Sequence, residues 1–212
     1  MPSHSMTGTP DSDDAPFWEQ TYRNDSADTF GRPSSEIVSL SERLPSGASV
    51  LDAGCGEGRN ARFLAARGFQ VDAFDVSAAG IGKLTRMAAA DGVHVNAWAD
   101  DLNTFDFSRS YDLIISHGVL HLLERDAWSR VIAQMKDHTR PGGVNVVAVF
   151  TDEIPPSDDL APFVRGLFEE GELARIYAGW RQEQATSYVL EDEHPGGVRH
   201  RHAIDKVVAW KE

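Results

Sequence analysis

The residues with the clearest chemical meaning form one glycine-rich segment, Val50-Leu51-Asp52-Ala53-Gly54-Cys55-Gly56-Glu57-Gly58-Arg59-Asn60. A short apolar run leads into three alternating glycines, and a helical pattern begins directly after them. Glycine allows the backbone to turn sharply and to lie directly against a ligand. In sheets of parallel strands, ligands bind beyond the carboxyl ends of the strands. The segment therefore predicts a ligand-binding turn between a buried strand and a helix.

The spacing of the glycines bears on the kind of ligand. Folds that bind nicotinamide cofactors use G-x-G-x-x-G and place the pyrophosphate at the amino terminus of the helix. Here the spacing is G-x-G-x-G, and Arg59 stands where the third glycine of that motif would be. Glu57, inside the loop, is also unfavourable beside a pyrophosphate. The spacing therefore disfavours a nicotinamide-dependent oxidoreductase, and a tight turn without any ligand is the other alternative.

Acidic residues follow the next two predicted strands. Asp75 stands 21 residues after Gly54. A carboxylate at that place can accept hydrogen bonds from both hydroxyls of a ribose; it could instead cap the following helix, although Ser77 is better placed to do so. Asp101 and Leu102 follow the third strand, where helix or turn capping is again the alternative. Because three successive strand ends carry such residues, the pattern favours a nucleoside ligand.

These residues need a scaffold of alternating strands and helices, which the hydrophobic pattern predicts. Strands are expected at 48–53, 69–74, 93–99, 111–116, 144–150, 186–190 and 198–210. Helices are expected from Pro16 onwards and at 34–43, 59–67, 77–90, 125–138 and 171–180. The last two strands are joined by too few residues for a helical crossover, so they should form a hairpin. The pattern predicts an α/β fold: a doubly wound, Rossmann-like, mostly parallel seven-stranded sheet with a C-terminal antiparallel hairpin.

Length and composition predict a single folded domain. The 212 residues are 41% hydrophobic and 25% charged, which is ordinary for a globular protein. Residues 1–15 lack an apolar core and are expected to form a disordered tail, with no signal peptide, ahead of one domain at 16–212. Cys55 is the only cysteine, which excludes an internal disulfide and suits the reducing cytoplasm.

The charge of the chain excludes some partners. The formal net charge is -13, from 33 acidic and 20 basic side chains. Such a surface should repel phosphate backbones, so no nucleic-acid partner is expected. No stretch approaches the roughly 20 apolar residues that a membrane-spanning helix requires. We therefore expect a cytoplasmic protein with a small-molecule partner and no membrane association, and the oligomeric state does not follow from the sequence.

The glycine loop resembles the first motif of class I S-adenosylmethionine-dependent methyltransferases. Its residues 54–60 are similar to the G-C-G-x-G-R-N loop of the tellurite-resistance (TehB-like) methyltransferases. Two further segments resemble that family: 168–173 followed by Tyr177, Gly179 and Trp180, and Tyr22 with the Arg-x-x-Ser-Glu element at 32–36. The resemblance runs from Phe17 to Trp210. It implies a methyltransferase domain, with a helical lid at 16–45 and an α/β core at 46–212, that uses S-adenosylmethionine and releases S-adenosylhomocysteine.

The resemblance also implies a set of cofactor-binding residues in the lid and at the strand ends. They are Tyr22, Arg32, Asp52, Gly54, Cys55, Gly56, Arg59, Asn60, Asp75, Val76, Asp101, Leu102, Ser116 and His117. In that set, Arg32 would lie near the methionine carboxylate, Asp52 would organise the glycine loop, and Ser116 and His117 would border the transferred methyl group. Without the resemblance, Arg32 precedes a proline and could equally be a solvated loop charge.

The expected reaction is an in-line attack on a sulfonium methyl group, for which the protein chiefly aligns the reacting atoms. A thiolate or a metalloid anion needs no strong base. A hydroxyl or an amine needs one, and His117 or His121 could serve, although both could equally be structural. We expect a metalloid oxyanion or a thiol as the acceptor, with O- or N-methylation of a small metabolite as the alternative.

Basic residues near the C-terminus are the candidates for acceptor recognition. The family has a His-Arg pair on this hairpin, whereas this chain has an acidic stretch at 191–193 and then Arg199, His200, Arg201 and His202. Alternation along a strand places the two arginines on one face and the two histidines on the other, and only one face can look into the pocket. His117, Arg199 and Arg201 are predicted to act in catalysis, and an exposed charged edge is the alternative for the arginines. No metal site is predicted, because zinc needs at least three convergent protein ligands.

Overall fold

The computed structural model describes residues 16–24, 26, 31–192 and 199–212. The predicted tail at 1–15 lies outside the described residues. Within the described part, no helix is both long enough and apolar enough to cross a membrane.

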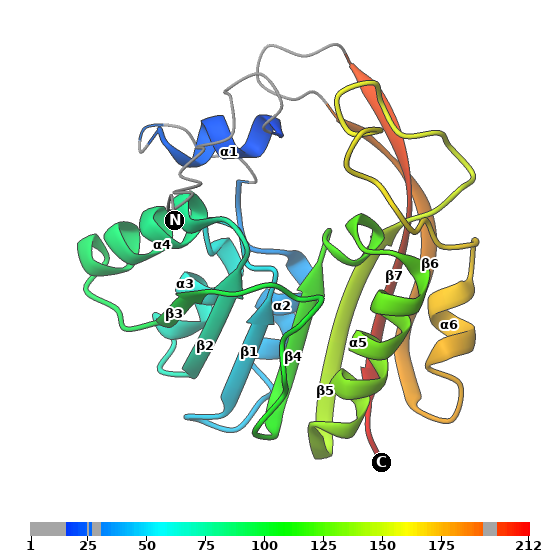
Figure 1. Ribbon diagram of the computed structural model, residues 1–212. Helices are drawn as coiled ribbons and strands as arrows, with labels where there is room; N and C mark the ends of the chain where they lie inside the picture. Colours follow the sequence, from blue (N-terminus) through cyan, green and yellow to red (C-terminus); the bar gives the residue numbers. More distant parts are fainter. Residues whose placement is uncertain (1–15, 25, 27–30, 193–198) are drawn as a thin grey trace, which may run out of the picture.

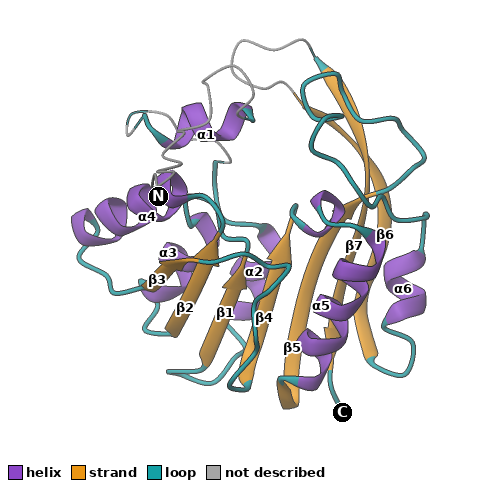
Figure 2. Ribbon diagram, in the orientation of Figure 1, coloured by secondary structure: helices purple, strands orange, loops and turns teal. Residues whose placement is uncertain are grey.

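A seven-stranded sheet forms the middle layer of the molecule (Figure 1, Figure 2). Its strands are β1 (Ser49–Ala53), β2 (Gln70–Asp75), β3 (Asn96–Ala99), β4 (Tyr111–His117), β5 (Thr139–Phe150), β6 (Arg181–Asp192) and β7 (His200–Trp210). Their order across the sheet is β3-β2-β1-β4-β5-β7-β6. Neighbours from β3 to β5 are parallel, and β7 runs antiparallel to both β5 and β6. The predicted mixed sheet with a C-terminal antiparallel hairpin is confirmed.

Helices cover both faces of the sheet (Figure 1). They are α1 (Phe17–Tyr22), α2 (Ser35–Ser41), α3 (Arg59–Ala65), α4 (Ala78–Ala90), the short 3-10 helix η1 (Leu120–Leu122), α5 (Arg125–Asp137) and α6 (Glu172–Ile176). On one face, α5 and α6 contribute Trp128 and Leu173 to an apolar core. On the other, α2, α3 and α4 contribute Ile37, Leu64 and Leu84 to a second core. Because both faces are covered, the central strands read as nearly continuous apolar runs.

Three predicted boundaries are wrong for tertiary reasons. β5 begins at Thr139 rather than at residue 144, because its register with β4 jumps from Tyr111–Thr139 to Leu113–Val144 and the intervening residues bulge. β6 extends well beyond 186–190 in both directions, because it pairs with β7 along its length. α6 is shorter than 171–180, and Gly179 has a φ of 88°, outside the helical region.

A buried ion pair joins α4 to the glycine loop. Lys83 Nζ lies 2.6 Å from Glu57 Oε2, and the two side chains are 0% and 4% exposed. Lys83 Nζ also donates a hydrogen bond to the carbonyl of Thr21, which ties α1 to α4. Removing two charges from water is costly, so such a pair is stable only while both partners are present. Glu57, which the sequence presents only as unfavourable for a pyrophosphate, therefore has a structural partner on the next helix.

Lys83→Met should lower the free energy of unfolding by about 3–5 kcal/mol, because it removes the buried cation that lies beside the Glu57 carboxylate. The double variant with Glu57→Leu should recover most of that loss, because the buried charge is then gone as well. Urea unfolding measures both variants. The matched control is Arg43→Met, which breaks the largely exposed pair with Glu183 and should barely move the midpoint. If Lys83→Met is as mild as this control, the role given to the buried pair is wrong.

Candidate functional site

A cavity of about 660 Å³ lies at the carboxyl ends of β1, β2 and β4. The glycine loop, α1 and the first residues of β7 also contribute to its wall. Small-molecule sites commonly have volumes of roughly 300–1,000 Å³. Of the predicted cofactor-binding residues, all except Arg32 and Ser116 line this cavity. Ser116 is fully buried within β4. The sequence therefore identified the part of the wall that the glycine loop and the strand ends form, but not the rest of the lining.

The three glycines determine the path of the loop. Gly54, Gly56 and Gly58 have φ values of 79°, 55° and 77°, in the left-handed region that favours glycine. A Cβ atom at Gly54 would lie 2.6 Å from Cγ1 of Val119, and one at Gly56 would lie 2.4 Å from the hydroxyl of Tyr22. Only glycine fits at these two positions, so the loop backbone packs directly against α1 and against the segment after β4.

Asp75 holds the loop and the start of α4 together. Its Oδ2 accepts a hydrogen bond from the Gly56 amide and its Oδ1 accepts one from the Ser77 amide, both at 2.8 Å. The hydroxyl of Ser77 accepts from the Gly80 amide, so the predicted helix cap is confirmed. Burial raises the pKa of Asp75, and the two backbone hydrogen bonds oppose that rise. Each carboxylate oxygen has a further lone pair, so Asp75 can still accept hydrogen bonds from a ligand in the cavity.

Burial changes the ionisation of two neighbours of the loop. Asp52 is 3% exposed, and burial raises its pKa to about 7, while Arg59 lowers it and Asp75 raises it further. A cation bound beside Asp52 would therefore favour its ionised form. Burial also raises the pKa of the Cys55 thiol well above its usual value. A thiol that stays protonated fits a packing residue better than a nucleophile.

The segment after β3 caps a turn and also lines the cavity. Oδ1 of Asp101 accepts hydrogen bonds from the backbone and the side-chain amides of Asn103, at 2.8 and 2.9 Å. This is the turn-capping role. Asp101 and the buried Leu102 also line the cavity, next to Asp100. The capped turn therefore presents a carboxylate and an apolar side chain to the cavity together.

The glycine loop also holds the segment that precedes α2. Oδ1 of Asn60 accepts a hydrogen bond from the Ser34 amide at 3.0 Å, and the Arg59 guanidinium donates to the Arg32 carbonyl at 3.3 Å. The side chain of Arg32 is exposed and does not line the cavity. The structure therefore does not place Arg32 where the resemblance implied, and the guanidinium in the cavity wall belongs to Arg59.

A second buried carboxylate, Glu36, joins α2 to β4 and β7. Its Oε1 lies 3.3 Å from Nε2 of His117 and 3.0 Å from Nζ of Lys206. Burial acts to raise the pKa of Glu36, but the neighbouring His117 and Lys206 outweigh it and lower the pKa to about 2. The other ring nitrogen of His117, Nδ1, lies 3.4 Å from the Arg59 guanidinium. Burial lowers the pKa of His117, so its ring is neutral and both nitrogens face protein groups.

The final hairpin presents its histidine face to the cavity. Arg199 and Arg201 are exposed and are not among the lining residues, whereas His202 is buried and lines the cavity. The alternation of side chains along β7 allows only one of the two faces to do so. The geometry therefore does not bring the two arginines to the site. Within the described part of the chain, no three metal-ligating side chains converge.

An aromatic stack continues this wall. The rings of His121 and Phe150 lie 4.0 Å apart at 16°, and those of Phe150 and His202 lie 4.2 Å apart at 8°. The Phe150 amide donates to Nδ1 of His121 at 3.2 Å. Burial, and then the neighbouring His202, lower the pKa of His121 to about 3, so its ring is neutral at physiological pH. Sequence reasoning missed Phe150, which lines the cavity, and Glu36, which contacts the lining residue His117, because only the tertiary fold brings them there.

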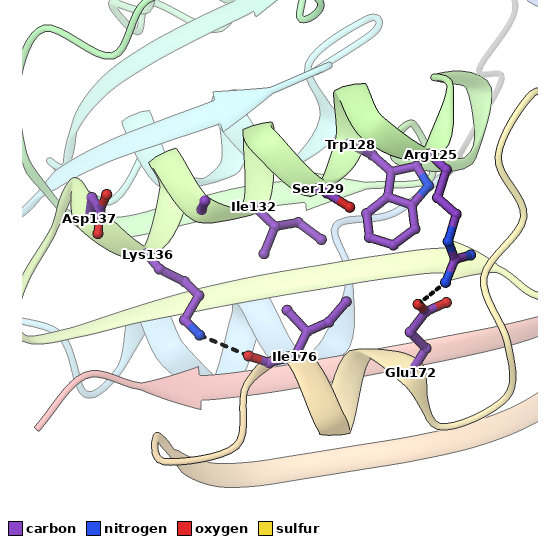
Figure 3. Close-up of a pocket in the computed structure, with 9 residues that line it drawn as sticks. Arg125, Trp128, Ser129, Ile132, Lys136, Asp137, Glu172 and Ile176 are labelled. Atoms are coloured by element: carbon purple, nitrogen blue, oxygen red, sulfur yellow. Dashed lines mark hydrogen bonds and ion pairs between the residues drawn. The ribbon is translucent and has the colours of Figure 1, made fainter.

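A second cavity, of about 440 Å³, lies between α5 and α6 (Figure 3). Lys136 donates to the Ile176 carbonyl at 2.8 Å toward one end of it, and Arg125 pairs with Glu172 toward the other. Both contacts bridge the two helices, and none of the predicted site residues lines this cavity. It is a seam in the packing of α6 on α5, which leaves the cavity at the glycine loop as the candidate site.

Comparisons with known proteins bear on this site. A family model described as the tellurite resistance protein TehB matches residues 18–194. Hemagglutinin 1 of Eikenella corrodens is 38% identical over 153 residues, which are 71% of this chain and 47% of that protein. The probable S-adenosyl-L-methionine-dependent methyltransferase TehB of Haemophilus influenzae is 32% identical over 140 residues, 65% of this chain and 48% of that protein. The chain thus spans about half the length of the curated relatives it matches.

Solved structures agree with the family match. The crystal structure of TehB from Haemophilus influenzae has a TM-score of 0.76 and 25% sequence identity, over 84% of this chain and 62% of that one. The predicted resemblance and fold class are confirmed, and the predicted enzyme class and cofactor are those in the name of the Haemophilus relative. The chain belongs to the family of the tellurite resistance protein TehB.

Proposed function

We propose that this chain transfers a methyl group from S-adenosylmethionine to a small molecule. The observation that carries the proposal is the meeting, in one cavity, of a side-chain-free glycine loop with the carboxylates Asp75 and Asp101 from the next two strand ends. These groups suit a nucleoside without a pyrophosphate, because the loop contains a buried glutamate that also lines the cavity. The family membership supports the same reading.

The residues present fit the parts of this cofactor. Asp75 offers carboxylate lone pairs for ribose hydroxyls. Leu102 and Val76 offer apolar surface to an adenine ring, with Asp101 beside them for its amino group. Arg59 and Asp52 lie together near the start of α3 and are complementary to a carboxylate and an ammonium group, respectively. This assignment gives Arg59 the role that the sequence suggested for Arg32.

When bound, the cofactor supplies an activated methyl group on a sulfonium, so little chemical assistance is required from the protein. The chain's own residues hold the cofactor and align the reacting atoms. Tyr22 covers the glycine loop, and Asp52 and Arg59 orient the charged end of the donor. His117 acts as a positioning residue rather than a base, because Glu36 and Arg59 face its two nitrogens. Closure by α1 limits water at the reacting atoms.

The acceptor expected from the sequence, a metalloid oxyanion or a thiol, remains a prediction that rests on the resemblance. The cytoplasmic location likewise remains a prediction. On the hairpin, the side chain of His202 lines the cavity, whereas those of Arg199 and Arg201 do not. A titration of acceptors must therefore include uncharged molecules as well as oxyanions.

Calorimetric titration tests the proposed cofactor. S-adenosylhomocysteine should bind, and NAD should bind far more weakly, because the loop has neither the spacing nor the charge for a pyrophosphate. Asp75→Asn should weaken binding of S-adenosylhomocysteine by about 1.5–3 kcal/mol, the range for a charged hydrogen bond. Asp106→Asn, at an exposed position outside the cavity, is the matched control and should bind like the parent. Comparable affinities for NAD and S-adenosylhomocysteine would reject the proposal.

Affinity for S-adenosylmethionine should depend on pH through Asp52. Below about 7 this carboxyl is largely protonated in the free protein, and a bound cation must expel the proton. Affinity should therefore rise as the pH rises through about 7, and the rise should be measured below the range in which the cofactor's own amino group titrates, about 7.7–8.0. Asp52→Asn should flatten this profile. An equal slope in parent and variant would show that another group is responsible.

A further inference from the structure

One half of the cavity is not used by the cofactor groups assigned above. We call it the acceptor half. It is lined by Phe17, Trp18, His121, Leu122, Leu123, Phe150, Leu160, Leu190, His202 and Ile204. These side chains come from α1, from the segment between β4 and α5, from the end of β5 and the loop that follows it, and from the hairpin. They are aliphatic, aromatic or imidazole groups, so the acceptor half has an apolar lining with few polar atoms.

The charges around the cavity disfavour an anionic acceptor. All 20 lysines and arginines of the chain fall within the described residues. Only one of them, Arg59, lines the cavity, and it lies on the glycine-loop side. The cavity is also lined by the carboxylates Asp52, Glu57, Asp75, Asp100 and Asp101. An oxyanion in the acceptor half would lose its hydration without gaining a counter-charge from a lysine or arginine there, and it would feel the field of these carboxylates.

His121 contributes a hydrogen-bond donor to the acceptor half. Its Nδ1 accepts the hydrogen bond from the Phe150 amide, so the proton of the neutral ring resides on Nε2. Stacking on Phe150 holds the ring in its plane. The low pKa of His121 keeps the ring in this neutral form. His121 therefore donates a hydrogen bond through Nε2 and offers no lone pair for removing a proton from an acceptor.

The stack of aromatic rings also determines which ligands are complementary to the acceptor half. Phe150 has His121 on one face and His202 on the other, so it presents its edge to the cavity that it lines. The edge of an aromatic ring carries partial positive charge and attracts electron-rich atoms. The wall formed by the stack is thus complementary to the in-plane lone pair of a ring nitrogen.

We infer that the acceptor half binds an uncharged heteroaromatic ring that accepts a hydrogen bond from Nε2 of His121. The inference rests on the proposed function and names its substrate class. A ring nitrogen with its own lone pair can form the new bond to the methyl carbon while the carbon–sulfur bond breaks and the sulfur keeps its electron pair. The positive charge passes from the sulfonium to the methylated ring, so no base is needed. His117, whose nitrogens face Glu36 and Arg59, and His121, whose lone pair accepts from the Phe150 amide, are not placed to act as bases, which agrees with this chemistry.

Binding in the presence of saturating S-adenosylhomocysteine tests the inference without relying on turnover. The probes are quinoxaline, which is uncharged and has two ring nitrogens, naphthalene, which has the same shape and none, and selenite. Quinoxaline should bind about tenfold more tightly than naphthalene, the equivalent of one net hydrogen bond. Selenite should not bind detectably. Tighter binding of selenite than of quinoxaline would overturn the inference.

Variants of His121 test whether this residue causes the difference in affinity between quinoxaline and naphthalene. His121→Phe keeps a ring for the stack but removes the donor, and it should bring the affinities for quinoxaline and naphthalene together. His121→Gln restores an amide donor and should recover most of the difference. His94→Asn, at an exposed position, should change nothing. A difference that persists in His121→Phe would overturn the role of this residue.

Two further measurements separate the possible failures. Nitrogen-15 NMR of the imidazole rings of the parent protein should show the proton of His121 on Nε2, and a proton on Nδ1 would contradict the assigned donor. Each variant is first titrated with S-adenosylhomocysteine alone. If the parent does not bind it, the proposed function fails. If every variant binds it normally and quinoxaline does not bind the parent, only the substrate class is wrong.

Discussion

The positions of the glycine loop and of α1 depend on the ion pair between Lys83 and Glu57. Both charges are out of water, so neither side chain can leave the other without a large cost. The pair therefore fixes the glycine loop against α4. With the loop in that position, the Gly56 amide meets Asp75 and the Gly56 backbone meets the ring of Tyr22. Because Lys83 also binds the Thr21 carbonyl, the same contact fixes α1 above the cavity.

Glu36 plays a comparable role between α2 and the core. It brings together a segment from near the N-terminus, the end of β4 and the last strand, through His117 and Lys206. Its low pKa means that this carboxylate stays charged throughout the physiological range. α1 and α2 are thus each attached to the core by a charged group. The cavity is bounded by parts of the chain that are far apart in sequence.

The sequence predicted those features that local patterns encode. The three glycines, Asp75 and Asp101 could be placed because each follows an apolar run that is recognisable as a strand. Ser77 could be identified as a cap because capping needs only the next three residues. The bulge at the start of β5 escaped prediction, because Pro141-Gly142-Gly143 is equally compatible with a turn and only the register with β4 distinguishes the two.

The features that the sequence did not predict depend on partners that lie far away in the chain. Arg32 and Arg59 are equally suitable cations in sequence, and only the folded chain shows that one is exposed and the other lines the cavity. Alternation along β7 could show that arginines and histidines lie on opposite faces, but not which face is inward. The partners of Glu57 and Glu36 were likewise invisible, because Lys83, His117 and Lys206 belong to other elements.

The imbalance of charge in the cavity has a consequence for turnover. Five carboxylates line it with a single guanidinium, and one of the five is neutralised by Lys83. Such a field attracts a sulfonium more strongly than the neutral thioether that remains after methyl transfer. Under the proposed function, the electrostatic attraction between the cavity and the cofactor therefore weakens when the methyl group has been transferred. The protein then favours exchange of the used cofactor for a fresh one, which limits inhibition by its own product.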